Sequence, residues 1–225
     1  MIRIVGSLGN CLGPEVNEIV SAIFHSIVFY RCYGKFHYKH EDSYSIGTLG
    51  YEEIACDFID FTYVRISSPQ LIQTINREIK AFVDKLRQEN SSHTNGAISL
   101  EFYQRRKGRW AFTDASPLVW EIWTVKVNCD KETNESQQKG RTEELLLEKL
   151  VTIVQIINNS KRYLPQMPDK QNSDTIFETN YPDVQPYIFK ISHSVGSAAN
   201  PPMMATQGTG DSSLKKFIKQ TLALD

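Results

Sequence analysis

Cysteine is scarce in this sequence, and the four cysteines are far apart. None of them forms a C-x-x-C pair; they are Cys11, Cys32, Cys56 and Cys129. Short-motif zinc sites and dithiol redox sites need such pairs, so neither is expected. A chain of 225 residues can bury a hydrophobic core without disulfide bonds. We therefore interpret the cysteines as small buried thiols.

An excess of charge of one sign is also absent. The chain carries 25 basic and 26 acidic side chains, which gives a formal net charge of −1. Proteins that bind nucleic acid or anionic membranes mainly through electrostatics have a strong positive field, and this chain has none overall. A local basic cluster leaves one weak alternative open, a nucleic-acid-binding loop. Its cations are Arg105, Arg106, Lys107 and Arg109.

Long hydrophobic runs are missing as well. The most apolar stretch, "LLLEKLVTIVQII" (145–157), contains Glu148 and Lys149 and is shorter than the ~20 residues that cross a bilayer. The first residues, "MIRIVGSLGN", have no apolar core typical of a signal peptide. The sequence therefore predicts no membrane insertion and a location in the cytosol or nucleus.

The motifs of common enzyme classes do not occur. There is no G-x-x-x-x-G-K-[ST], no G-x-S-x-G and no H-E-x-x-H. The glycines of "GSLGNCLG" (6–13) have the wrong spacing for a dinucleotide-binding G-x-G-x-x-G. We interpret residues 6–13 as a flexible entry to the first helix.

Isolated polar pairs do not combine into a site either. His37 and His40 form H-x-x-H, but in a segment of strand and turn the positions i and i+3 point to opposite faces. Asp57 and Asp60 are expected on opposite faces of one strand, which disfavours acid–base chemistry. Cys56 has no base near it in the sequence. The sequence predicts no catalytic residue, no metal ligand and no cofactor.

Three segments have the apolar spacing of amphipathic helices. The first begins at Pro14 and ends before Gly34, and the second has Ser68 as its N-cap and Pro69 as its first residue. The third extends from Glu135 to Asn159 and is so apolar in its last turns that we expect it to be the central, mostly covered helix.

The remaining regular segments read as strands. They are short strands and turns over 34–50, an alternating strand over 56–67, strands at 97–106 and 117–128, and a strand over 184–195. Three helices against one mostly antiparallel sheet define an α+β class. Residues 196–213 are rich in glycine, proline and small polar residues and are predicted to be mobile. A short amphipathic helix follows, with one apolar side formed by Leu214, Phe217, Ile218 and Leu222.

The loop between the strands at 97–106 and 117–128 is unusual. It is longer than the ~2–5 residues of ordinary hairpin loops, and it carries Trp110 and Phe112 among basic residues. Two interpretations stay open: the rings fold back on the protein's own flank, or they project toward a partner. In the second case Arg109 and its basic neighbours keep the loop hydrated and steer an acidic partner.

Several blocks of the sequence together resemble one known family. These are "GKFHYKHEDSYSIGTLG", "CDFIDFTYVRISS", "SLEFYQRRKGRWAFTD", "WEIWTVKV" and "VQPYIFKIS". They are closely similar to the autophagy-related protein 101 family and extend from the first helix to the closing "TLAL". The similarity is weakest at residues 1–13, 129–142 and 196–213.

The resemblance implies a single HORMA domain over residues 1–225, with three central helices packed on a sheet. It implies an adaptor without enzymatic activity, cofactor or metal. It also implies pairing with the HORMA domain of autophagy-related protein 13 within the Unc-51-like kinase complex. The expected location is the cytoplasm, with recruitment to the site of autophagosome formation, and no nucleic acid is expected as a partner.

The resemblance also implies a site. The family has a projecting finger, here residues 105–117, whose tryptophan and phenylalanine recruit downstream autophagy factors, and Trp110 and Phe112 fall on these two positions. Arg109 and Ala111 support them. The family has proline where this chain has Ala111, so we expect a more mobile finger. A checkpoint-type HORMA protein that traps a peptide beneath its C-terminal segment remains an alternative, because residues 196–213 suit such a belt.

Overall fold

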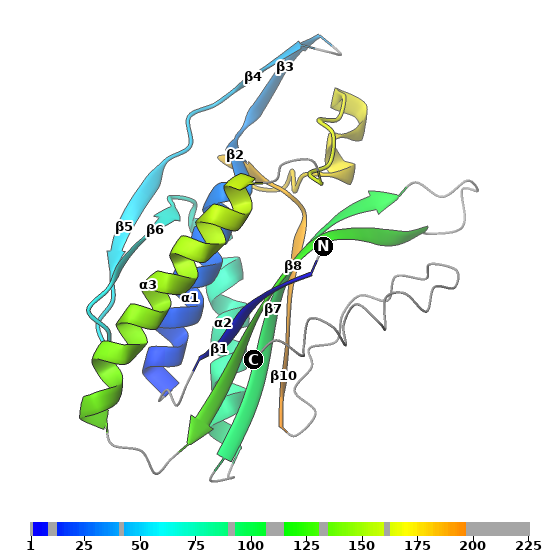
Figure 1. The fold of residues 1–225 in the computed structure, drawn as a ribbon. Helices are drawn as coiled ribbons and strands as arrows, with labels where there is room; N and C mark the ends of the chain where they lie inside the picture. The colour runs from blue at the N-terminus through cyan, green and yellow to red at the C-terminus, as the bar shows by residue number, and fades with distance from the viewer. Residues whose placement is uncertain are drawn as a thin grey trace.

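The computed structural model describes residues 2–8, 13–40, 43–89, 93–106, 115–130, 135–159 and 163–196 (Figure 1). The predicted site residues Arg109, Trp110, Ala111 and Phe112 lie outside this part of the chain, as does the predicted mobile segment from residue 197 onward. The helices are α1 (Gly13–Tyr30), α2 (Pro69–Gln88), α3 (Glu135–Asn159) and a 3-10 turn, η1 (Lys170–Thr175).

The main sheet has four strands in the order β1-β8-β7-β10. Strand β1 is parallel to β8, and the other two pairings are antiparallel. The bounds are β1 (Ile2–Leu8), β7 (His93–Arg106), β8 (Ala115–Asp130) and β10 (Phe189–Val195). The α+β class and the mostly antiparallel pairing are confirmed.

Three small two-stranded sheets accompany the main one. Their strands are β2 (Cys32–Gly34) with β9 (Val184–Pro186), β3 (Phe36–His40) with β4 (Ser43–Ile46), and β5 (Tyr51–Ala55) with β6 (Thr62–Ile66). The predicted strand over 184–195 is therefore two strands, β9 and β10, which belong to different sheets.

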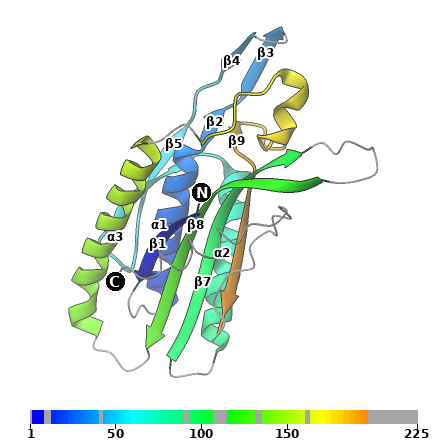
Figure 2. The ribbon, with the colours of Figure 1, turned by 45° about the vertical axis from the view of Figure 1, so that its right-hand side comes forward.

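The three helices lie on a single face of the main sheet (Figures 1 and 2). Helix α1 is the buried one, and its predicted apolar stripe is confirmed: Val16, Ile19, Val20, Ile23, Phe24, Ile27 and Val28 are at most 1% exposed. Helix α2 buries the same kind of stripe, formed by Leu71, Ile75, Ile79, Phe82, Val83 and Leu86.

The prediction that α3 is the central helix is wrong. Its bounds are as predicted, and Leu146, Ile153 and Ile157 are buried, but Leu147 and Val151 are 55% and 47% exposed. The apolar side chains of α3 spread over more of its circumference than its contacts with α1 and β1 can cover. An apolar surface therefore remains on its outer side.

The predicted strand over 56–67 is only half correct, because residues 56–61 form the turn between β5 and β6. Carboxylates from distant helices bind the backbone of this turn. Glu18 of α1 accepts hydrogen bonds from the amides of Asp57, Phe58 and Ile59, at 2.6, 3.0 and 3.1 Å. Glu143 of α3 accepts one from Asp60, at 2.9 Å. Alternation in the sequence carries no sign of these partners.

The first residues are also more ordered than their sequence indicates. Residues 6–13 were expected to form a flexible entry, whereas β1 extends to Leu8 and pairs in parallel with β8. A parallel partner more than a hundred residues away leaves no local signature. Gly34, expected to stop α1, lies in β2, and a Cβ there would clash with the carbonyl oxygen of Gly47.

Burial of His25 on α1 makes stability depend on pH. The side chain is 3% exposed, its Nε2 lies 2.9 Å from Asn76 Oδ1, and burial lowers its pKa to about 4. Between pH 6.5 and 4 the unfolded chain binds a proton that the folded chain excludes. Stability present above pH 6.5 is therefore lost as the pH falls toward 4, by up to about 3 kcal/mol.

Urea unfolding of the wild type and of His25→Gln at pH 7 and pH 4.5 measures this contribution. Glutamine can donate to Asn76 but does not titrate, so other acid-sensitive groups cancel in the difference. Between pH 7 and pH 4.5, the free energy of unfolding of the wild type should fall by about 2–3 kcal/mol more than that of the variant. Equal losses would show that His25 is protonated in the folded state at pH 4.5.

Candidate functional site

The most prominent feature on the sheet is the hairpin of β7 and β8. Its pairing continues from His93 opposite Asp130 to Arg106 opposite Ala115, and it projects beyond the helices (Figure 1). The predicted hairpin is confirmed. Both ends of the predicted finger are strand, because β7 includes residues 105–106 and β8 begins at Ala115. The connection consists of residues 107–114.

The stem next to this connection is anchored from one side. The amide of Tyr103 donates to the carbonyl of Ile188, at 3.1 Å. Arg105 donates from Nη1 to the carbonyl of Asp174, at 3.0 Å, and its Nη2 lies 3.8 Å from Glu178. Arg105, one of the cations of the predicted basic cluster, lies in the predicted strand and connects the stem to η1. The basic cluster thus offers less charge to a nucleic acid than the sequence indicates.

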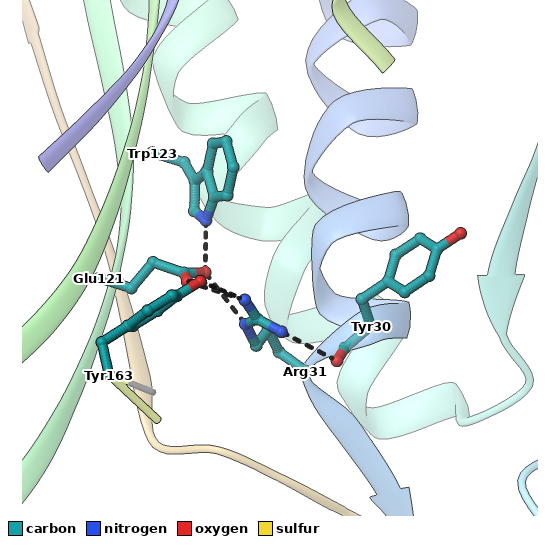
Figure 3. A network of polar contacts seen from close by, with 5 residues as sticks. All are labelled: Tyr30, Arg31, Glu121, Trp123 and Tyr163. Carbon is teal, nitrogen blue, oxygen red and sulfur yellow. Dashed lines mark hydrogen bonds and ion pairs between the residues drawn. The ribbon is translucent and has the colours of Figure 1, made fainter. Parts of the chain in front are cut away.

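A buried ion pair lies deeper in the same hairpin (Figure 3). Glu121 of β8 is fully buried, and its two oxygens accept from Nε and Nη2 of Arg31, at 3.1 and 2.9 Å. The indole of Trp123 donates to one oxygen and the hydroxyl of Tyr163 to the other, both at 2.6 Å. The carboxylate therefore accepts four hydrogen bonds from three side chains, and a buried charge requires such partners.

This network connects three parts of the chain. Arg31 follows α1, Glu121 and Trp123 are in β8, and Tyr163 follows α3. Burial alone would lower the pKa of Arg31, but the hydrogen bond and the charge of Glu121 outweigh burial and raise it. The hairpin stem is consequently held to the helical layer by ionic bonds as well as by packing.

Aromatic rings complete the base of the hairpin. Trp120 contacts Phe102 and Tyr187, with ring centroids 5.5 and 5.1 Å apart, and Tyr187 stacks on Phe177 at 4.7 Å. Burial raises the pKa of Tyr187, so its hydroxyl stays neutral. The sequence analysis predicted no role for these residues. The one feature of the sequence that could have indicated the buried network is a single carboxylate, Glu121, inside the apolar run "LVWEIWTVKV".

A second candidate region is a cleft of about 540 Å³ between α1, α2 and the β5–β6 turn. Cys56 lines it, and burial raises the pKa of this thiol to about 11. Burial also raises the pKa of Cys32, to about 12, so neither thiol is an activated nucleophile. The cleft's charges include Lys80 and Asp84, which pair with each other at 2.6 Å.

The histidine and aspartate pairs noted in the sequence do not combine into a site. His37 and His40 are exposed on β3, and Asp57 and Asp60 are exposed in the β5–β6 turn. No three metal-ligating side chains gather anywhere in the part of the chain that the structure describes. Over the same residues, no helix combines the length and apolar character needed to cross a membrane.

Fold and site together define an α+β protein with three helices on one face of a mixed sheet and a long, anchored, projecting hairpin. Comparison with known proteins gives the family. Residues 11–171 match the model of the family "Autophagy-related protein 101", and the chain belongs to that family. Membership supports a role in autophagy.

Relatives from distant organisms carry the name of the same family. The autophagy-related protein 101 of Xenopus tropicalis is 42% identical over 215 residues, and that of Homo sapiens is 40% identical over 215 residues; each alignment covers 94% of both chains. The protein of the same name from Arabidopsis thaliana is 24% identical over 178 residues, covering 69% of this chain and 75% of the relative.

Proposed function

We propose that this chain is a non-enzymatic adaptor of the autophagy-initiation complex, built as a single HORMA domain. It pairs with the HORMA domain of autophagy-related protein 13 within the Unc-51-like kinase complex. It acts in the cytoplasm at the site of autophagosome formation and recruits downstream factors through Trp110 and Phe112, flanked by Arg109 and Ala111.

The observation that carries the recruitment role is the anchored stem of the β7–β8 hairpin. The stem is held by Arg105 at its side and by the Arg31–Glu121 pair at its base. A rigid stem fixes where residues 107–114 are presented, which lowers the ordering cost when a partner covers two aromatic rings. Tryptophan is among the residues in which binding energy concentrates.

The pairing role is supported by an apolar surface on the outer side of α3. Leu147 and Val151 are one helical turn apart and are 55% and 47% exposed. Phe58, 49% exposed, belongs to the turn whose Asp60 amide binds Glu143, one turn before Leu147. These three residues, here called the α3 patch, offer a partner domain apolar area that this chain leaves in water.

Replacing both α3 residues of this patch tests the pairing. Leu147→Asp with Val151→Asp should weaken binding of the partner HORMA domain at least about thirtyfold, because two apolar contacts become charged. Calorimetric titration measures the affinity. Thr152→Asp with Asn159→Asp adds the same charge at exposed positions of α3 and removes no apolar contact, so it should bind as the wild type does.

The melting temperature of each variant separates binding from folding. Both residues are exposed, so their replacement should leave folding nearly unchanged. A folded Leu147→Asp/Val151→Asp variant that binds with wild-type affinity would contradict the assignment of the α3 patch to pairing.

A further inference from the structure

Strand β5 has a free edge. In the part of the chain that the structure describes, β5 pairs with β6 alone, and it lies at the left margin of the molecule in Figure 1. Helix α1 contacts β6, so the unpaired edge of β5 is the one that faces away from the helices. Three exposed side chains follow this edge: Tyr51, Glu53 and Ala55.

The register shows which backbone groups point to the free edge. Hydrogen bonds close both ends of the β5–β6 ladder, at 3.0 and 2.9 Å; they run from the amide of Ser67 to the carbonyl of Gly50 and from the amide of Cys56 to the carbonyl of Phe61. Because alternate pairs of an antiparallel ladder exchange hydrogen bonds, residues 52 and 54 bond to β6. The amides and carbonyls of residues 51, 53 and 55 point outward. None of them has a hydrogen-bond partner among the described residues, so an added strand can bind them.

The surface along this edge is acidic. Residues 51–61 contain four acidic side chains and no basic one. Glu52 pairs with Arg65 at 3.0 Å. The other three are exposed and have no cationic partner in the described ranges: Glu53, Asp57 and Asp60. Glu18 and Glu143, which bind the turn at 56–61, add further negative charge. Besides the paired Lys80, the adjoining cleft adds one cation, Arg87, so the surface stays negative.

Aromatic rings lie at the start of the same edge. Tyr51 and Tyr30 are 63% and 41% exposed. Each lies edge-on against Phe29, with ring centroids 6.4 and 5.8 Å apart. The face of an exposed tyrosine ring attracts the cation of lysine or arginine. The rings and the carboxylates therefore favour the same kind of ligand.

We propose that β5 binds an extended, cationic segment of a partner protein by strand addition, a role beyond the pairing and recruitment proposed above. Backbone hydrogen bonds to residues 51, 53 and 55 hold the segment, and its lysine or arginine side chains lie beside Glu53 and the carboxylates of the turn. A second copy of this chain does not fit the edge. Antiparallel pairing of two β5 strands about Glu53 would place two glutamates opposite each other, which is destabilising.

Hydrogen exchange of the backbone amides, followed by NMR on the full chain, tests strand addition. The probe is a short capped peptide in which lysine alternates with valine, at millimolar concentration. It should slow exchange of the amides of Tyr51, Glu53 and Ala55 at least about tenfold. The amides of residues 52 and 54 already bond to β6 and should change little. A peptide with glutamate in place of lysine is the matched control and should protect none of them.

Substitutions on β5 separate the backbone contribution from the charge. Ala55→Pro removes one outward amide at a sheet edge, where proline is tolerated, and should weaken binding of the lysine peptide about fivefold. Ala55→Ser keeps the amide and should bind as the wild type does. Glu53→Lys should weaken binding at least about tenfold. Asp174→Lys makes the same change of charge at an exposed position of η1 and should have no effect.

Unchanged exchange at residues 51, 53 and 55 in the presence of the lysine peptide would overturn the proposal. Equal protection by the glutamate peptide would refute a cationic ligand, and wild-type binding by both Ala55→Pro and Glu53→Lys would refute the site. Protection that appears without peptide and rises with protein concentration would assign the edge to a second copy and would also overturn the proposal. The melting temperature of each variant shows that it is folded.

Discussion

Arg31→Met should lower the stability of the protein by about 3–5 kcal/mol, and its melting temperature by about 6–20 °C. Methionine keeps most of the volume of the arginine stem but removes the cation, which leaves the Glu121 carboxylate fully buried with only neutral donors. The loss is large because an uncompensated buried charge is costly, whereas the intact pair is close to neutral in its net contribution. Urea unfolding followed by tryptophan fluorescence measures it.

Two comparisons isolate the cause. Arg77→Met removes an arginine of the same size whose side chain is 70% exposed beside Glu78, and it should cost less than about 1 kcal/mol. Arg31→Met combined with Glu121→Leu removes both charges and should be more stable than Arg31→Met alone. If the double variant is less stable than the single one, the carboxylate is not the source of the loss.

Trp110→Ala with Phe112→Ala should abolish recruitment of downstream autophagy factors while leaving the melting temperature nearly unchanged. Two aromatic rings can bury ~150–250 Å² each at a partner, or up to roughly 7–12 kcal/mol before the costs of binding. Loss of both anchors should weaken binding by at least about a hundredfold. Recruitment is measured in cells lacking the native protein, as the number of sites where downstream factors accumulate.

The neighbouring positions supply the controls for this variant. Lys107→Ala with Thr113→Ala shortens two side chains of the same loop without removing a ring and should retain recruitment. Ala111→Pro should retain or strengthen it, because proline restricts the backbone between the rings. A large fall in the melting temperature of Trp110→Ala/Phe112→Ala would contradict the proposal, because it would show that the rings belong to the protein's own core.

Periodicity predicted α1 and α2 well because each of these two helices buries one continuous apolar stripe. The apolar faces of α1 and α2 and the ends of α3 follow from the sequence with little error. The position of α3 in the fold does not follow from the sequence. In a sequence, an apolar residue such as Leu147 is the same whether its side chain packs against this chain or against a partner. Composition alone cannot distinguish a covered helix from one with an interface.

Partners that are distant in sequence explain the remaining differences. Strand β1 depends on β8, and the turn at 56–61 depends on Glu18 and Glu143, so local alternation could not reveal either. The glutamates at 101 and 121 were visible as lone charges in apolar strands, but the sequence does not show that they face opposite sides of one sheet. Their neighbouring places in the β7–β8 register settle that point.

The proposed pairing of this chain with the HORMA domain of autophagy-related protein 13 is tested most directly by size-exclusion chromatography with light scattering. The two proteins, from the same source, are run alone and mixed at micromolar concentration. A single peak with the mass of a one-to-one complex is the expected result. Separate elution of the two chains would contradict the adaptor function proposed here, although membership in the family would stand.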